Sequence, residues 1–145
     1  MSMFSDSSHH ETVDLDVLRN LADAQGEDES DLVVELIDLY LTDTQRRLVS
    51  FCQARDDRDA LALARAAHAL KGSSATLGAC FLARLCEELE RLARLEAFAE
   101  LVEVMRRLEE ECVLVKEKLL RERQLRVTAG GGEARIAEDE SSTSA

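Results

Sequence analysis

The sequence predicts an all-α protein, an antiparallel up-and-down four-helix bundle with a short additional N-terminal helix and disordered termini. Its 145 residues include no proline and are rich in Leu, Ala, Glu and Arg, which favour helix. Apolar residues also recur at alternating steps of three and four along three segments, which is the spacing of a buried helix face. Short connections between such helices make neighbours antiparallel, so a bundle follows.

The first elements are expected in a simple order. Residues 1–12 are polar and are expected to form a disordered leader. A short helix is expected at 14–25, and a long second helix at 30–54. A third helix, capped by Asp56 or Asp57, is expected to run to Leu77 and to stop at Gly78.

The fourth and fifth helices are expected at 79–94 and 96–126. The stripes of the last three helices are Ala60, Leu63, Ala67, Leu70, Ser74 and Leu77; Leu82, Leu85, Leu89 and Leu92; and Phe98, Leu101, Met105, Leu108, Cys112, Val115 and Leu119. Beyond Arg126 the pattern stops at three glycines, and residues 127–145 are expected to form a disordered acidic tail. The folded domain is therefore expected to span residues 13–126.

Composition excludes several classes of partner. The formal net charge is −12, which argues against nucleic acid and against an anionic membrane surface. No apolar run is long enough for a membrane span, and the start of the chain lacks a secretory signal, so a cytoplasmic location is expected. The four cysteines lack metal-ligand spacing and are expected to be small buried hydrophobes in a reducing compartment, with no metal bound.

One histidine lies outside the first ten residues, and its helical neighbours are unusual. One turn from His68 lie Ala64 on one side and Lys71 with Gly72 on the other, and Ala75 follows a turn later. A glycine inside a helix costs about 1 kcal/mol relative to alanine, so a reason other than local stability is expected for it. Ala64, Gly72 and Ala75 are expected to clear space around the imidazole. The alternative is an ordinary surface or core histidine.

The residue types around this histidine suit phosphoryl transfer. Neutral imidazole is a nucleophile, and the ammonium of Lys71 would stabilise a phosphoryl group arriving on the ring. The chain has no phosphate-binding loop, no kinase signature and no acidic triad for Mg²⁺. The sequence therefore predicts half of an active centre, to be completed by another protein.

A partner surface is also expected near this helix. The first half of the second helix is apolar on more than one face, which makes Leu36, Leu39 and Tyr40 candidates for an exposed patch that binds a partner. Burial of all three beneath the first helix is the alternative. Arg65 and Ser73, on the third helix, are further candidates for partner binding.

The fourth helix is expected to face the same site. If the third and fourth helices form a hairpin, the middle of the fourth lies level with His68. Arg91 or Arg94 would then approach a phosphoryl group, and Glu87 or Glu90 would hydrogen-bond the imidazole. The alternative is that these four side chains form solvated ion pairs along their own helix.

The stretch Ala67–Ala79, with its His-x-Leu-Lys-Gly-Ser-Ser…Leu-Gly core, resembles the signature of histidine-containing phosphotransfer (HPt) domains. The resemblance covers about residues 14–115. It implies that His68 accepts a phosphoryl group from a receiver-domain aspartate and passes it to another, with Lys71 on the phosphate side and Gly72 clearing space.

The resemblance implies a phosphocarrier without ATP-dependent kinase activity and without a cofactor. The implied partners are receiver domains of hybrid histidine kinases and of response regulators. Mg²⁺ in such relays belongs to the receiver, so the resemblance implies no metal in this chain. Two alternatives are an HPt-like adaptor that regulates a receiver without carrying phosphate, and a small enzyme that uses His68 as acid or base. The lack of a second catalytic group disfavours the enzyme.

Overall fold

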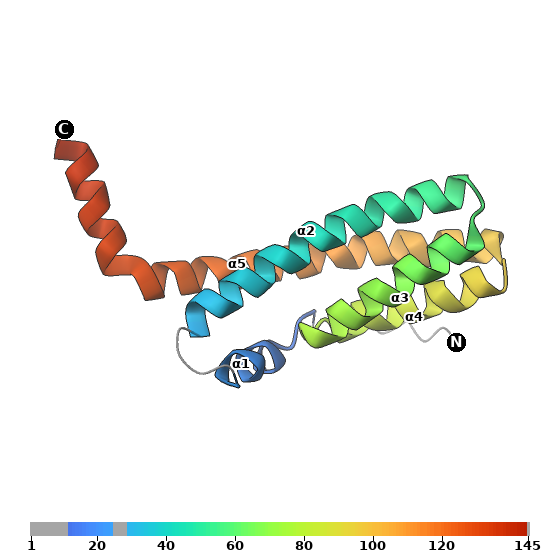
Figure 1. Ribbon diagram of the computed structural model, residues 1–145, viewed down its shortest axis with the longest axis horizontal. Coiled ribbons are helices and arrows are strands. Elements are labelled where there is room, and N and C mark those ends of the chain that lie inside the picture. The colour runs from blue at the N-terminus through green and yellow to red at the C-terminus, as the bar shows by residue number, and fades with distance from the viewer. Residues whose placement is uncertain (1–11, 25–28, 145) are drawn as a thin grey trace.

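Five helices make up the chain in the computed structural model, which describes residues 12–24 and 29–144 (Figure 1). They are α1 (Leu15–Asp23), α2 (Glu29–Asp56), α3 (Ala60–Thr76), α4 (Cys80–Arg94) and α5 (Phe98–Ser144). The long helices α2 to α5 lie side by side, and the short α1 packs against α2. No strand occurs among the described residues. The predicted all-α bundle with a short extra N-terminal helix is confirmed.

The core lies where the apolar stripes predict it. Every member of the α4 and α5 stripes is buried, and in α3 only Ala60 remains partly exposed. The largest fully buried side chains include Phe51 from α2, Leu70 from α3, Leu85 from α4 and Leu108 from α5. All four long helices therefore contribute to one core, and burial of this apolar surface is the main force that holds the bundle together.

The connection between α2 and α3 differs from the expected one. The N-cap of α3 is Asp59, whose Oδ1 accepts a hydrogen bond from the Ala62 amide at 3.1 Å. The prediction of Asp56 or Asp57 as the cap was wrong, because α2 continues to Asp56 and the chain then reverses through Arg58, at φ 52°. Asp59 is the acidic residue next to the helical run, so it alone reaches the free amides.

Gly78 lies in the turn between α3 and α4 and also contacts the N-terminal segment. Its φ is +87°, a left-handed conformation that glycine adopts without strain. The Asp14 amide donates a hydrogen bond to the Gly78 carbonyl oxygen at 2.9 Å. A Cβ at position 78 would lie 2.5 Å from the Asp14 carbonyl oxygen. This turn therefore needs glycine both for its backbone angle and for the close approach of a second backbone.

Substituting this glycine is expected to destabilise the bundle. We expect Gly78→Ala to lower the free energy of unfolding by about 2 kcal/mol, because the new methyl group is strained and clashes with Asp14. Gly72→Ala is the matched control, since a Cβ at position 72 meets nothing within 4 Å, and it is expected to raise the free energy of unfolding by about 1 kcal/mol. Urea denaturation measures both. Equal midpoints for the two variants would contradict this account of Gly78.

The end of α5 also differs from the expected one. The helix does not stop near Arg126 but continues to Ser144, and its last part turns away from the bundle (Figure 1). The predicted end of the fifth helix at 126 was wrong. The disordered tail at 127–145 and the end of the folded domain at 126 stay predictions. No proline follows the glycines, and Glu133, Ala134 and Arg135 favour helix. Of the predicted leader 1–12, residues 1–11 lie outside the described residues.

Only two of the four thiols are buried as expected. Burial raises the pKa of Cys86 above its ordinary value and that of Cys112 to about 12. Cys52 is half-buried, and Cys80, the first residue of α4, is exposed at the end of the bundle. The described residues contain no cluster of side chains suited to hold a metal ion. Within the same residues, no helix has the length and apolar character needed to cross a bilayer.

Candidate functional site

His68 lies on the surface of α3, with its ring attached to α4 through one nitrogen. Its side chain is 65% exposed, and Nδ1 lies 3.1 Å from Oε1 of Glu90. Glu90 itself is only 13% exposed, so the carboxylate is a fixed support for an accessible ring. Nε2 makes no hydrogen bond to any described residue. The expectation that Glu87 or Glu90 holds the imidazole is confirmed for Glu90.

Glu90 is shared by three cationic or hydrogen-bonding side chains. Its Oε2 accepts hydrogen bonds from Arg94, at 2.9 Å from Nη2 and 3.2 Å from Nε. Lys71 Nζ lies 3.9 Å from Oε1 of Glu90. It also lies 3.7 Å from Oε2 of Glu87. Partial burial acts to raise the pKa of Glu90, but the hydrogen bonds from Arg94 and His68 outweigh it and hold the pKa below its ordinary value. Glu90 is therefore ionised at neutral pH.

An ionised carboxylate decides which nitrogen of the ring carries the proton. A carboxylate only accepts hydrogen bonds, so Nδ1 of His68 must donate to Glu90. In neutral imidazole the lone pair then lies on Nε2. The arrangement presents a nucleophilic nitrogen at the surface and holds the ring still.

The small residues one or two turns from His68 differ in their exposure to solvent. Gly72 and Ala75 are exposed, and the space above Gly72 is open. Ala64, which was expected to clear space around the ring together with them, is buried at 1% exposure and does not form part of the open surface. It forms part of a hollow of about 270 Å³ that Leu61 and Arg94 also line. The open surface beside His68 is therefore on its C-terminal side, over Gly72 and Ala75.

The two arginines predicted to reach a phosphoryl group do not contact His68. Arg91 forms two hydrogen bonds of 2.7 Å with Glu88, which raise the pKa of Arg91. Arg94 is bound to Glu90, so it lies one side chain away from the imidazole. Both guanidinium groups are occupied by carboxylates, whereas the contacts of Lys71 are at the limit of ion-pair distance.

The predicted partner-binding residues are only partly at the surface. Leu39 and Arg65 are exposed, whereas Leu36 and Ser73 are half-buried. Ser73 donates a hydrogen bond to the Leu70 carbonyl at 3.2 Å. Tyr40 is buried, so its assignment to an exposed patch was wrong.

Tyr40 belongs instead to a contact between α2 and α3. Its hydroxyl lies 2.7 Å from Ser74 Oγ, and both residues are buried. Sequence reasoning missed this pair, because a polar residue in the α3 stripe is the only local signal of it. The pair fixes α2 against the helix that carries His68.

Comparison with known proteins identifies the family. A family model, the Hpt domain, matches residues 35–129, which include α3, α4 and the site around His68. The chain belongs to the Hpt family. The solved structure of histidine-containing phosphotransfer protein B (HptB) from Pseudomonas aeruginosa PAO1 is similar, with a TM-score of 0.72 and 34% sequence identity. The match covers 78% of this chain and 95% of that chain. A comparison with curated proteins finds no match.

Membership of the Hpt family confirms the resemblance carried by the His68 motif. The chain is thus a phosphotransfer intermediate of two-component signalling. Hpt domains are phosphocarriers rather than kinases, and they interact with receiver domains of response regulators.

Proposed function

We propose that His68 is the residue that carries the phosphoryl group, taking it from a receiver-domain aspartate of a hybrid histidine kinase and passing it to a response regulator. The observation that supports this role is the state of the ring: Nδ1 is bound to a mostly buried carboxylate, while the side chain is 65% exposed. A nucleophile that must meet an aspartate on another protein needs both fixed orientation and open access.

The transfer needs no proton to move. The Nε2 lone pair attacks the phosphorus of the aspartyl phosphate, an N–P bond forms, and the P–O bond breaks with its electron pair left on the aspartate carboxylate. Nδ1 keeps its proton and its hydrogen bond to Glu90, so the positive charge that develops on the ring faces a negative carboxylate. A second receiver aspartate reverses these steps.

Lys71 is positioned to meet the phosphoryl oxygens. Its contacts with Glu87 and Glu90 are 3.7 and 3.9 Å long, so little is lost when the ammonium turns towards an arriving phosphate. Phosphoryl transfer depends mainly on positioning and charge stabilisation, and Glu90 and Lys71 would supply these two effects here. Arg94 is a second phosphate-side cation only if it leaves Glu90.

The test is direct labelling. Receiver domains from the same genome are phosphorylated with a labelled small phosphodonor and incubated with the full chain and Mg²⁺. We expect at least one receiver to transfer acid-labile, alkali-stable label to the chain within minutes. Receiver binding without label on the chain, for every receiver tested, would reject the carrier in favour of the adaptor.

Removing the support for the ring should slow transfer. We expect Glu90→Ala to lower the transfer rate about tenfold, because the ring loses its orientation and Nδ1 loses its acceptor. Glu90→Gln keeps an accepting oxygen and should retain most of the rate. Nitrogen NMR of the imidazole gives a second measurement, in which Glu90→Ala lowers the fraction of the Nδ1–H form. Unchanged rate and unchanged tautomer in Glu90→Ala would show that the contact has no role.

The charge of Lys71 should matter for transfer and little for folding. We expect Lys71→Ala to slow transfer or to shorten the lifetime of the phosphohistidine several-fold, with almost no change in Tm because its ion pairs are long and partly exposed. Lys71→Arg keeps the charge and serves as the matched control. A large fall in Tm for Lys71→Ala would make the residue structural.

A further inference from the structure

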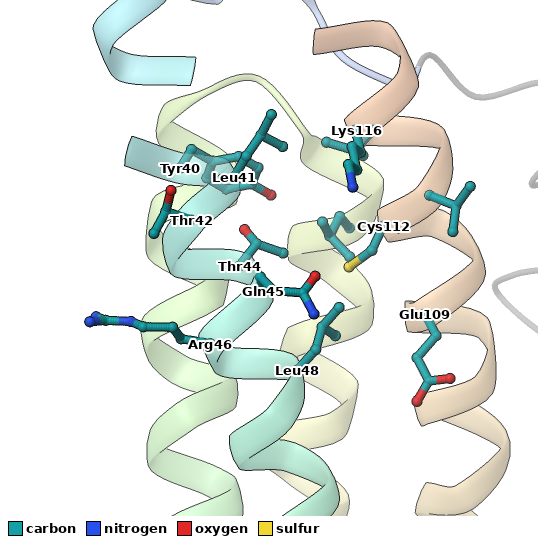
Figure 2. Close-up of a pocket in the computed structure, with 13 residues that line it drawn as sticks. Tyr40, Leu41, Thr42, Thr44, Gln45, Arg46, Leu48, Glu109, Cys112 and Lys116 are labelled. Atoms are coloured by element: carbon teal, nitrogen blue, oxygen red, sulfur yellow. The ribbon is translucent and has the colours of Figure 1, made fainter. Parts of the chain in front are cut away.

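A second hollow, of about 600 Å³, lies between α2 and α5 and opens at the surface of the bundle (Figure 2). Leu41, Leu48 and Val113 are among the apolar side chains that line it. The helices contact one another in the order α2, α3, α4, α5 and back to α2. The α2–α5 side is therefore opposite the α3–α4 side, where His68 contacts Glu90. A protein that covered this hollow would leave His68 accessible.

Exposed apolar side chains continue along α5 on both sides of the hollow. Val102 lies three helical turns before Val113, and Leu120 lies two turns after it, so all three point to one side of the helix. Their exposed fractions lie between 42% and 57%. We call these three residues the apolar strip of α5. Its half-exposed branched side chains, next to a hollow with apolar walls, are typical of a surface that binds another protein.

Two charged residues without an ion pair lie on either side of Val113 in the same strip. Glu109 lies one turn before Val113 and Lys116 one turn after it, and both line the hollow (Figure 2). Both are exposed, and neither forms an ion pair with any described residue. They do not reach each other, because two turns of helix separate them by about 10.5 Å. Arg106, by contrast, is paired with Glu103 and Glu110 of its own helix.

We propose that this side of α5 binds the same side of a second copy of the chain, in an antiparallel crossing with a two-fold axis at Val113. An opposite charge on each side of an apolar residue is complementary to its own reversed copy. The axis places the two Val113 side chains against each other. Lys116 then faces the partner's Glu109, and Glu109 faces the partner's Lys116. The contact covers the apolar strip and pairs charges that have no ion pair in the single chain.

Sedimentation velocity of the full chain at physiological ionic strength tests the proposal. Salt is needed because each chain has a net charge of −12, and the repulsion between two copies must be screened. We expect the mass to rise from monomer to dimer as the concentration increases. A monomer at every concentration up to the millimolar range would overturn the proposal.

A charge at the proposed axis should prevent this contact. We expect Val113→Glu to weaken dimerisation at least about tenfold, because it places two carboxylates in an apolar contact. Leu114→Glu is the matched control. Leu114 is also exposed, at 48%, but it points about 100° away from Val113 around the helix, so its replacement should leave dimerisation unchanged. Equal effects of the two variants would reject an axis at Val113.

Charge reversals test which residues face each other. Glu109→Lys alone or Lys116→Glu alone places like charges together at both contacts, so each variant should dimerise about tenfold more weakly. An equal mixture of the two variants restores opposite charges at both contacts and should form mixed dimers as tightly as the unaltered chain. Both variants should keep the Tm of the unaltered chain, because the two side chains are exposed. Mixed dimers no tighter than those of either variant alone would reject the proposed pairing.

Discussion

His68→Gln is expected to abolish phosphoryl labelling of the chain completely while leaving the fold intact. An amide nitrogen has no lone pair available for attack on phosphorus, so the loss should exceed that of any other single substitution. The side chain is mostly exposed and contributes one hydrogen bond, so Tm should hardly change. Label and Tm, measured on the same preparation, check both halves of this expectation.

The other two histidines provide the matched control. His9 and His10 lie at the start of the chain, and a His9→Gln, His10→Gln double variant should take label at the normal rate. Binding of a receiver by His68→Gln should persist, because the docking surface extends beyond one imidazole. Equal labelling of His68→Gln and the unaltered chain would show that the phosphoacceptor lies elsewhere.

Gly72→Leu is expected to lower the transfer rate about a hundredfold. A small misplacement of the reacting groups lowers a rate by about this factor. The structure gives no internal reason for glycine at this position: a Cβ there meets nothing within 4 Å, and the residue is exposed, one turn before the end of α3. Leucine favours helix more than glycine does, so the free energy of unfolding should rise. Stability and transfer are therefore expected to change in opposite directions.

Ala62→Leu makes the same kind of addition on another face of α3. Ala62 is exposed, six residues before His68, and its replacement should leave transfer unchanged. Rates from time courses of label transfer, with urea denaturation alongside, measure the two effects. A Gly72→Leu variant that transfers at the normal rate would show that the open surface above this glycine is not needed by the partner.

Helical periodicity predicted most of this site because the site follows one helix and its neighbour in a hairpin. The spacing of His68, Lys71 and Gly72 places them on one side of α3 whatever the rest of the bundle does. The α3–α4 hairpin, fixed by Gly78, then brings Glu90 level with the ring. Local geometry and one tight turn were sufficient for these contacts.

Periodicity could not predict how deep each residue lies. Ala64 and Gly72 are each one turn from His68, on its two sides, but the edge of the buried surface falls between Ala64 and His68. Tyr40 lies on a helix that is apolar on several sides, so its direction depends on Ser74 in another helix. Contacts between distant segments decide such cases, and no spacing within one helix reports them.

The cap and the last helix were missed for a different reason. Asp56, Asp57 and Asp59 are all good caps, and the choice depends on where α2 ends. The continuation of α5 past the glycines depends on competing small preferences over many residues, which single breakers do not settle. In both cases the sequence indicates that a cap or a helix end is present but does not fix the residue at which it lies.

The pairing of both nearby arginines with carboxylates has a consequence for the group-transfer potential of the proposed phosphohistidine. Arg91 is bound to Glu88 and Arg94 to Glu90, so neither planar fork is free to clamp a phosphate with two parallel hydrogen bonds. The ammonium of Lys71 is loosely held, and Arg65, one turn before His68 on α3, forms no ion pair with any described residue. The two arginines of α4 would thus contribute little to holding a phosphoryl group on His68, so they would not hinder its onward transfer to a second aspartate. The ion pairs along α4 would then help to keep the relay reversible.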